Sequence, residues 1–363
     1  MKFLNMLFKI LIIFVLSFSV YNHCITQYVL GSENKMKSEN YVDGKFVNSV
    51  PTKTSFSTGE YWDMSKAYIK GGQKHRTPSK PLPVMKPDSF TNHPSEEIKF
   101  VWLGHSSILL EFEKKRFLID PMFSERASGV QWFGPKRFQP TPLKLSELPK
   151  IDAVLISHNH YDHLDKTTIK YLSGKVKYFY VPLGIKSILK NWGIDENKIV
   201  ELDWWEESTK SDIKIFATPA RHFANRGLFD MNETFWCSWT LIGEKIKVFF
   251  SGDTAETPQH KEIGEKFGPF DLAFIEIGSY DKLWPDVHSY PEDAVKAYID
   301  LGGKLLVPIH WGTFDLALHS WFEPIERFAK EADLKKVNII TPKIGETIDI
   351  HNFKNESWWA KVR

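Results

Sequence analysis

Short apolar runs rich in β-branched and aromatic residues recur along the chain from residue 99 onward. Runs of this kind predict β-strands, and we expect them at 99–103, 108–112, 117–119, 153–156, 178–181, 214–217, 234–242, 247–250, 272–277 and 305–309. Segments with helical boundary signals lie between several of the strands, at 184–192, 259–267, 292–301 and 324–332. Strands that alternate with helices indicate a layered α/β fold.

A dense group of polar residues directly follows the apolar run 153–157. It reads His158-Asn159-His160-Tyr161-Asp162-His163. Residues two apart on an extended segment point the same way, so His158 and His160 can reach one metal ion, while Asp162 and His163 turn toward a second. A solvated polar loop is the weaker interpretation, because such a pattern rarely arises by chance in a chain with 13 His. The segment therefore predicts a site for two metal ions.

Three more residues of ligand type stand where strand-like runs end. They are His222, Asp253 and His310, each of which directly follows such a run. Loops at the ends of strands are where α/β domains commonly display functional groups. One His or Asp in such a place would mean little by itself. Together with the first cluster, the three residues supply the ligands that two metal ions would still lack.

In the order of its motifs, the chain resembles the metallo-β-lactamase superfamily, and specifically the branch of the N-acyl-phosphatidylethanolamine-hydrolysing phospholipase D. The resemblance runs from about Lys99 to about Ile350 and rests on blocks at 134–138, 156–165, 252–254, 267–273, 291–295 and 310–314. It implies a four-layer αββα sandwich, which periodicity alone does not distinguish from a doubly wound sheet.

The resemblance also implies how the ligands are shared. His158, His160 and His222 would hold one zinc ion, Asp162, His163 and His310 would hold the other, and Asp253 would bridge the two. Imidazole nitrogen and carboxylate oxygen suit zinc, and the motif contains no cysteine, which argues against an iron–sulfur cluster. Iron and manganese remain alternatives. Because two such ions lower the pKa of a coordinated water to roughly 7, the site would need no Ser or Cys nucleophile.

We place Asp162 and His288 in the catalytic set. His288 precedes an expected helix and could donate a proton or a hydrogen bond to a phosphate; the alternative is a surface histidine at the start of that helix. Four further residues near the motifs are candidates for substrate binding: Arg221, Phe223, Tyr280 and Trp284. Asp165 and Thr254 are expected to accept the free N–H groups of the ligand imidazoles, with helix capping as the alternative.

Site and resemblance together predict a zinc-dependent phosphodiesterase that hydrolyses N-acyl-phosphatidylethanolamine to phosphatidic acid and an N-acylethanolamine at a membrane surface. Two ions about 3.5–4 Å apart suit phosphodiester cleavage, because they can stabilise both the developing charge and the leaving oxygen. The same centre could attack a carbonyl group, so a lactonase or β-lactamase-like hydrolase is the alternative. A membrane-tethered binding protein without activity is a third hypothesis, but all seven proposed ligands are present.

The N-terminal segment 1–30 differs in character from the rest of the chain. The stretch from Ile10 to Val29 carries no charge and is long enough to span a bilayer, and no clear cleavage site follows its apolar part. It predicts a signal peptide or a retained anchor, and hence a location in the cell envelope on the outside face of the membrane. Residues 31–97 are predicted to form a polar linker and an irregular covering arm, and residues 98–363 the hydrolase domain.

Composition narrows the classes of function further. The 47 basic and 45 acidic side chains give a net charge of +2, which offers no electrostatic argument for nucleic acid as a partner. Aromatic residues make up 14% of the chain, and those near the motifs could line an apolar groove for acyl chains. A disulfide would have to join Cys24 of the N-terminal segment to Cys237, which we expect to be a small core residue.

Overall fold

The computed structural model describes residues 37–54, 57–71, 73–88 and 93–363. The predicted signal peptide or anchor, residues 1–30, lies outside these ranges. Within them, no helix combines the length and the apolar character that crossing a membrane requires.

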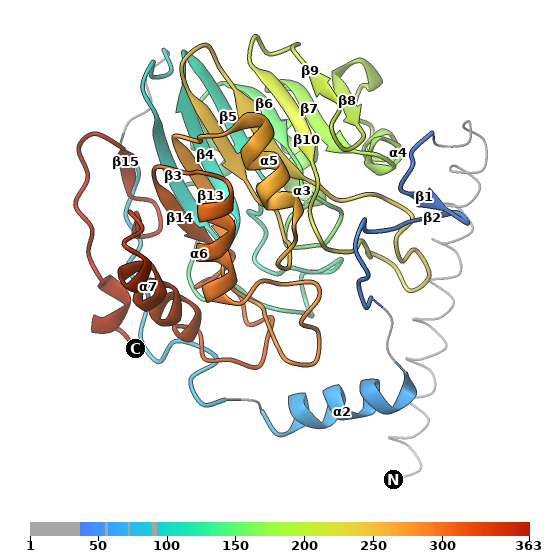
Figure 1. Cartoon of the computed structure of the whole chain (residues 1–363), viewed down its shortest axis with the longest axis vertical. Coiled ribbons are helices and arrows are strands. Elements are labelled where there is room, and N and C mark those ends of the chain that lie inside the picture. The colour runs from blue at the N-terminus through green and yellow to red at the C-terminus, as the bar shows by residue number, and fades with distance from the viewer. Residues whose placement is uncertain (1–36, 55–56, 72, 89–92) are drawn as a thin grey trace.

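Two β-sheets packed face to face form the centre of the protein, and helices cover the outer face of each sheet (Figure 1). The αββα sandwich implied by the resemblance is therefore confirmed. Both faces of each sheet are apolar and buried. One face packs against the other sheet, and the opposite face packs against helices.

The first sheet has seven strands in the order β15-β3-β4-β5-β6-β7-β8. Their bounds are β3 (Lys99–Gly104), β4 (Ser107–Phe112), β5 (Lys115–Ile119), β6 (Ile151–Leu155), β7 (Val176–Pro182), β8 (Ile199–Leu202) and β15 (Thr347–Asp349). Side chains alternate between the faces, so Phe100 joins the core between the sheets while Val101 joins the outer core. The outer core is shared with α3 (Lys166–Leu172) and α4 (Ile185–Asn191).

The second sheet has six strands in the order β14-β13-β12-β11-β10-β9. Their bounds are β9 (Glu207–Ser208), β10 (Lys214–Thr218), β11 (Ser238–Ile242), β12 (Lys247–Phe250), β13 (Leu272–Glu276) and β14 (Leu306–Ile309). Buried side chains of α5 (Gln259–Phe267), α6 (Pro291–Asp300) and α7 (Glu323–Lys335) complete its core. Phe274 of β13 meets Phe100 of β3 edge-on, with 5.1 Å between ring centroids, so the two sheets share one apolar layer.

One predicted strand differs from the structure in an informative way. The pattern predicts a strand over 234–242, but β11 begins only at Ser238. Phe235 and Cys237 are buried, which explains the apolar pattern. Their amides, however, donate to the carbonyl oxygens of Leu183 and Ser157, which follow β7 and β6 of the other sheet. The apolar run thus predicted burial correctly and pairing wrongly.

The N-terminal arm is more regular than its composition predicts. β1 (Tyr41–Val42) pairs with β2 (Lys45–Phe46), and α2 covers Thr58–Ile69. A capping box begins this helix: the Ser57 amide donates to Glu60 Oε2 at 2.8 Å, and the Glu60 amide donates to Ser57 Oγ at 3.3 Å. The sequence shows this Ser-x-x-Glu pattern, so the helix start could have been predicted.

Gly264 of α5 lies against the end of α6. A Cβ atom at Gly264 would lie 2.1 Å from the carbonyl oxygen of Asp300, whereas one at the exposed Gly174 would meet nothing within 4 Å. Alanine normally stabilises a helix by about 1 kcal/mol relative to glycine. We nevertheless expect Gly264→Ala to lower the free energy of unfolding by about 1–3 kcal/mol, because the two helices would have to move apart. Urea unfolding of Gly264→Ala and of the control Gly174→Ala measures this, and a more stable Gly264→Ala protein would contradict the packing.

Candidate metal centre

Residues of ligand type gather at one edge of the sandwich. β3, β5 and β6 run in the same direction within the first sheet, and β10, β12, β13 and β14 do so within the second. A polar residue of the site ends each of these strands or follows it closely; in chain order these residues are His105, Asp120, His158, His222, Asp253, Glu276 and His310. Because strands of one direction end at the same edge, residues far apart in sequence meet there.

His158, His160, His222 and Asp253 form the first group of ligands, and their ligand atoms all lie within 4.8 Å of one another. His160 Nδ1 lies 2.9 Å from His158 Nε2 and 3.3 Å from His222 Nε2. Tetrahedral coordination with metal–nitrogen distances of about 2.0–2.1 Å places ligand nitrogens about 3.3 Å apart. The three imidazoles are therefore spaced to share one ion.

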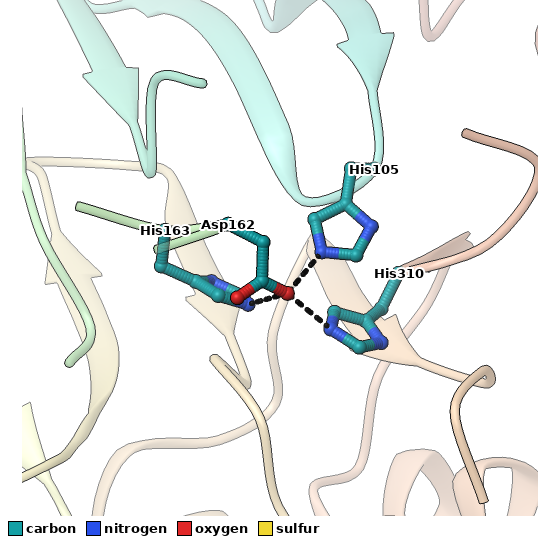
Figure 2. A group of neighbouring side chains, drawn as sticks. All are labelled: His105, Asp162, His163 and His310. Carbon is teal, nitrogen blue, oxygen red and sulfur yellow. Dashed lines mark hydrogen bonds and ion pairs between the residues drawn. The ribbon is translucent and has the colours of Figure 1, made fainter. Parts of the chain in front are cut away.

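His105, Asp162, His163 and His310 form the second group (Figure 2). Asp162 Oδ2 lies at its centre, 2.7 Å from His105 Nε2 and 3.4 Å from the Nε2 atoms of both His163 and His310. The separation of 2.7 Å is that of a hydrogen bond, so His105 orients the carboxylate. The longer separations suit ligands of one ion.

Asp253 connects the two groups. Its Oδ2 lies 3.0 Å from His310 Nε2 and 3.2 Å from His163 Nε2. The same oxygen lies 3.8 Å from the Nε2 atoms of both His158 and His222. The structure thus brings together all seven ligands named in the sequence analysis, with Asp253 between the two sets.

Neighbouring groups hold the imidazole nitrogens that face away from the ligand groups. His222 Nδ1 lies 2.7 Å from Val287 O, His163 Nδ1 lies 2.7 Å from Asp120 Oδ2, and His158 Nδ1 lies 2.9 Å from Ser157 Oγ. Partners of this kind fix the orientation of each ring and leave its Nε2 lone pair free for an ion.

Burial and charge together set the protonation of the site. Burial lowers the pKa of His158 and His160 well below the usual range, and neighbouring imidazoles lower it further, so both rings are neutral at pH 7. Burial acts on His163 and His310 in the same direction, but Asp253 and other carboxylates outweigh it. They raise the pKa of His163 well above the usual range and that of His310 to about 10. A divalent cation would take the place of these protons.

Several buried polar atoms of the site have no hydrogen-bond partner among the residues that the structure describes. They are His163 Nε2, Asp253 Oδ1 and both ring nitrogens of His310. Buried polar groups are nearly always hydrogen-bonded or bound to an ion, because a buried polar group without a partner destabilises the folded protein. Nitrogen and oxygen donors that converge without partners fit a divalent metal ion.

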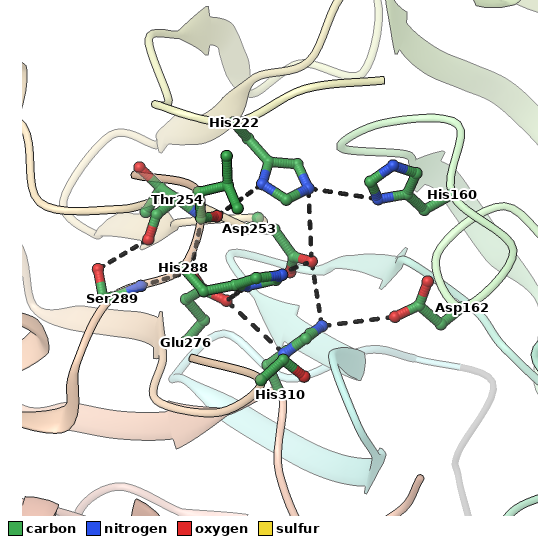
Figure 3. Close-up of polar contacts among 12 residues, drawn as sticks. His160, Asp162, His222, Asp253, Thr254, Glu276, His288, Ser289 and His310 are labelled. Atoms are coloured by element: carbon green, nitrogen blue, oxygen red, sulfur yellow. Dashed lines mark hydrogen bonds and ion pairs between the residues drawn. The ribbon is translucent and has the colours of Figure 1, made fainter. Parts of the chain in front are cut away.

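His288 and Phe223, two of the other predicted site residues, lie against the ligands. His288 Nδ1 lies 2.9 Å from Glu276 Oε2 and 4.0 Å from Asp253 Oδ2, and its side chain is 13% exposed (Figure 3). Phe223 packs edge-on against His160, with 4.7 Å between ring centroids. His288 is thus beside the ligands and only slightly exposed, and Phe223 packs against the ring of one ligand.

The other three residues predicted to contact substrate are engaged elsewhere by their polar atoms. Arg221 donates to Pro51 O and pairs with Asp286, the Tyr280 hydroxyl donates to Glu323, and the Trp284 indole N–H donates to Ser279 O. Burial raises the pKa of Tyr280, and the Glu323 carboxylate raises it further, so the hydroxyl stays protonated. These contacts anchor loops. The hydrogen bonds described for these three side chains do not reach the ligand groups.

Asp165 and Thr254 bind backbone groups, and none of their described hydrogen bonds reaches a ligand imidazole. Asp165 Oδ1 accepts from the Thr167 amide in the first turn of α3, which is the capping alternative. Thr254 Oγ1 accepts from the Arg221 amide at 2.9 Å and so links the loop after β12 to the loop after β10.

Three residues of the site were not predicted from the sequence: His105, Asp120 and Glu276. All three lie at strand ends, as His222 and Asp253 do, so the same signal applied to them. No motif singled them out, and a single polar residue at a strand end is usually structural.

The N-terminal arm reaches the site through Asn48. Its Nδ2 donates to His222 O at 2.8 Å, and its Oδ1 accepts from the His222 amide and from the Trp236 indole N–H, both at 3.1 Å. Phe46 is buried and stacks on Phe235, with 4.5 Å between ring centroids. This packing holds the arm beside the loop after β10, which carries His222. The arm therefore supports the backbone of a ligand.

Asp120 allows the support of a ligand ring to be tested. Asp120→Asn keeps the size of the side chain but removes the carboxylate that holds His163 Nδ1. We expect metal affinity to fall about 10–100-fold, because the ring loses its orientation. Competition with a fluorescent chelator measures the affinity. Asp212→Asn is the control, since this exposed carboxylate pairs with Lys115 outside the site; equal affinities for the two variants would contradict the role of Asp120.

Comparison with known proteins finds relatives in sequence and in fold. A family model described as a beta-lactamase superfamily domain matches residues 115–311. N-acyl-phosphatidylethanolamine-hydrolyzing phospholipase D 1 of Caenorhabditis elegans is 37% identical over 283 residues, which cover 73% of this chain and 79% of the relative. An uncharacterised protein of Mycobacterium tuberculosis is 39% identical over 328 residues, which cover 89% and 88% of the two chains.

Solved structures show the same architecture. Igni18, a metallo hydrolase from the archaeon Ignicoccus hospitalis, matches 71% of this chain and 99% of its own length with a TM-score of 0.53. At 20% sequence identity this likeness shows the fold alone. The sequence matches establish that the chain is a metal-dependent hydrolase of the metallo-β-lactamase superfamily and belongs to the branch that resembles N-acyl-phosphatidylethanolamine-hydrolysing phospholipase D.

Proposed function

We propose that the protein is a phosphodiesterase that uses two zinc ions to hydrolyse N-acyl-phosphatidylethanolamine to phosphatidic acid and an N-acylethanolamine. The observation that carries the reaction type is the position of Asp253 Oδ2 between the two ligand groups. One carboxylate that faces both groups suits two ions close together, and such pairs are adapted to phosphodiesters. The relative from C. elegans, whose name gives this activity, supports the choice of substrate.

The chain's own groups would bind and orient the substrate. Divalent ions held by the two groups would supply Lewis acidity and activate a water for attack on phosphorus. His288 lies beside Asp253 and is partly exposed, so it can exchange a proton or a hydrogen bond with the phosphodiester. Phe223 covers one side of His160 and limits the access of bulk water there.

Exposed apolar side chains near the segment 158–163, the loop that carries four of the predicted ligands, support a lipid substrate. A cavity of about 460 Å³ lies next to this loop and is lined in part by Tyr161, Trp192 and Arg226. Two loops that contribute to its lining carry exposed apolar residues, namely Trp132, Phe133, Leu228 and Phe229. Aromatic and aliphatic side chains of this kind partition into the interface of a bilayer.

The proposed place of action is a membrane surface on the outside face of the cell envelope. This proposal depends on the segment 1–30, which lies outside the described residues. A phospholipid substrate is consistent with it, because such a substrate is itself held in a membrane.

Product analysis tests the proposed reaction. Full-length protein loaded with zinc is incubated with micelles of N-acyl-phosphatidylethanolamine, and the products are identified by mass spectrometry. We expect phosphatidic acid and N-acylethanolamine from the wild type and at least 100-fold less from Asp253→Asn, because the shared ligand loses its charge. Cleavage of a generic phosphodiester without cleavage of the lipid would contradict the substrate, and hydrolysis of a lactone alone would contradict the reaction.

Trp132 and Phe133 allow the lipid surface to be tested. Their side chains are 76% and 69% exposed, so their replacement should not disturb the core. We expect the double variant Trp132→Ala/Phe133→Ala to raise the KM for substrate in vesicles about tenfold and to leave cleavage of a soluble phosphodiester unchanged. Leu334→Ala, which removes a side chain 64% exposed on α7, is the control. An unchanged KM for the double variant would show that these loops do not meet the lipid.

A further inference from the structure

Glu276 is a buried carboxylate with no part in the reaction as described above. It ends β13, is 0% exposed, and pairs with no Lys or Arg within the part of the chain that the structure describes. Burying a carboxylate costs free energy unless hydrogen bonds or charges compensate it. The groups that contact its two oxygens therefore show how it is accommodated.

One oxygen of Glu276 holds the backbone beside two site residues. Oε1 accepts from the Thr254 amide at 2.8 Å and from the Ser289 amide at 3.2 Å. Thr254 directly follows Asp253, and Ser289 directly follows His288. The Ser289 hydroxyl also donates to Thr254 O at 2.7 Å, which joins the two segments to each other (Figure 3).

The other oxygen faces two imidazoles. Oε2 lies 2.9 Å from His288 Nδ1 and 3.6 Å from His310 Nδ1. The two rings stack on each other, with 5.2 Å between their centroids. His310 Nε2 lies 3.0 Å from Asp253 Oδ2, among the ligand atoms. A hydrogen on Nδ1 of His288 would be donated to Glu276 and would leave the Nε2 lone pair of that ring free.

We propose that Glu276 is a positioning residue: it fixes the Nδ1–H tautomer of His288, and it ties the loop of Asp253 to the loop of His288. As part of phosphodiester cleavage this proposal rests on the proposed function, whereas the assignment of the His288 tautomer rests on the geometry.

The tautomer gives His288 a defined task in the reaction. Its Nε2 lone pair accepts a proton from the attacking water as the new bond from oxygen to phosphorus forms. The bond between phosphorus and the ethanolamine oxygen then breaks, and the same proton passes from Nε2 to that oxygen.

A third metal ion is the competing explanation for this arrangement. Ligand atoms of Asp253, Glu276, His288 and His310 also lie within 4.8 Å of one another. Glu276 Oε2 and His288 Nδ1, however, are already at hydrogen-bond distance, and Oε1 is occupied by two amides. A direct hydrogen bond therefore accounts for the contact, and metal content distinguishes the two explanations.

The first test requires no change at Glu276. Full-length protein is labelled with ¹⁵N at its 13 histidines, loaded with zinc, and examined by NMR correlations that distinguish a protonated from a bare ring nitrogen. The spectrum of His288→Ala identifies the signals of His288. We expect Nδ1 of His288 to carry the hydrogen. A hydrogen on Nε2 with a bare Nδ1 would overturn the proposal.

The second test compares Glu276→Gln with Glu113→Gln. Glu113 lies in the turn after β4, at the opposite end of that strand from the site, and it also accepts backbone amides, those of Glu244 and Lys245. We expect Glu276→Gln to change the tautomer signals of His288 and to weaken zinc binding about tenfold, with the number of ions bound at saturation unchanged. Glu113→Gln should change neither.

Two outcomes of the second test would overturn the proposal. Loss of one whole zinc ion at saturation would make Glu276 a metal ligand, and unchanged tautomer signals with unchanged affinity would make it merely structural. Neither readout depends on lipid cleavage. If the tautomer and affinity results hold while N-acyl-phosphatidylethanolamine is not cleaved, the proposed function fails and the role of Glu276 stands.

Discussion

The packing of the two sheets against each other is the constraint on which the site depends. Phe100 and Phe274 meet edge-on across the interface, and close packing of this kind resists sliding of one sheet over the other. The ligands come from both sheets, since His158 follows a strand of the first and His222 follows a strand of the second. Their distances from Asp253 leave little room for movement. The apolar core therefore sets the geometry of a polar site.

The main ligands were predictable because each carries a local signal. Within 158–163 the spacing of the residues already encodes their direction, and His222, Asp253 and His310 follow runs that the pattern marks as strands. Periodicity also located most strands and helices. It did not give the order of strands in the two sheets, which depends on pairing between distant segments; the resemblance to a known superfamily supplied the architecture.

The remaining features depend on contacts that no local pattern encodes. His105 belongs to the site because it binds Asp162, 57 residues further along the chain. The residues around His105 in the sequence give no sign of that contact. Tyr280 shows the reverse case: its position close to the motifs suggested a contact with substrate, but its hydroxyl binds Glu323 of α7. A side chain's neighbours in space decide its role, and sequence gives only its neighbours along the chain.

The contact between Asn48 and His222 has a consequence for where the catalytic unit begins. The family model matches from residue 115, so the segment by which the superfamily is recognised excludes a side chain that holds both the amide and the carbonyl of a ligand. Chimeras that exchange the N-terminal arm between relatives would exchange part of the support of His222 with it. Substitutions in the arm and in the loop after β10 should accordingly have been selected together.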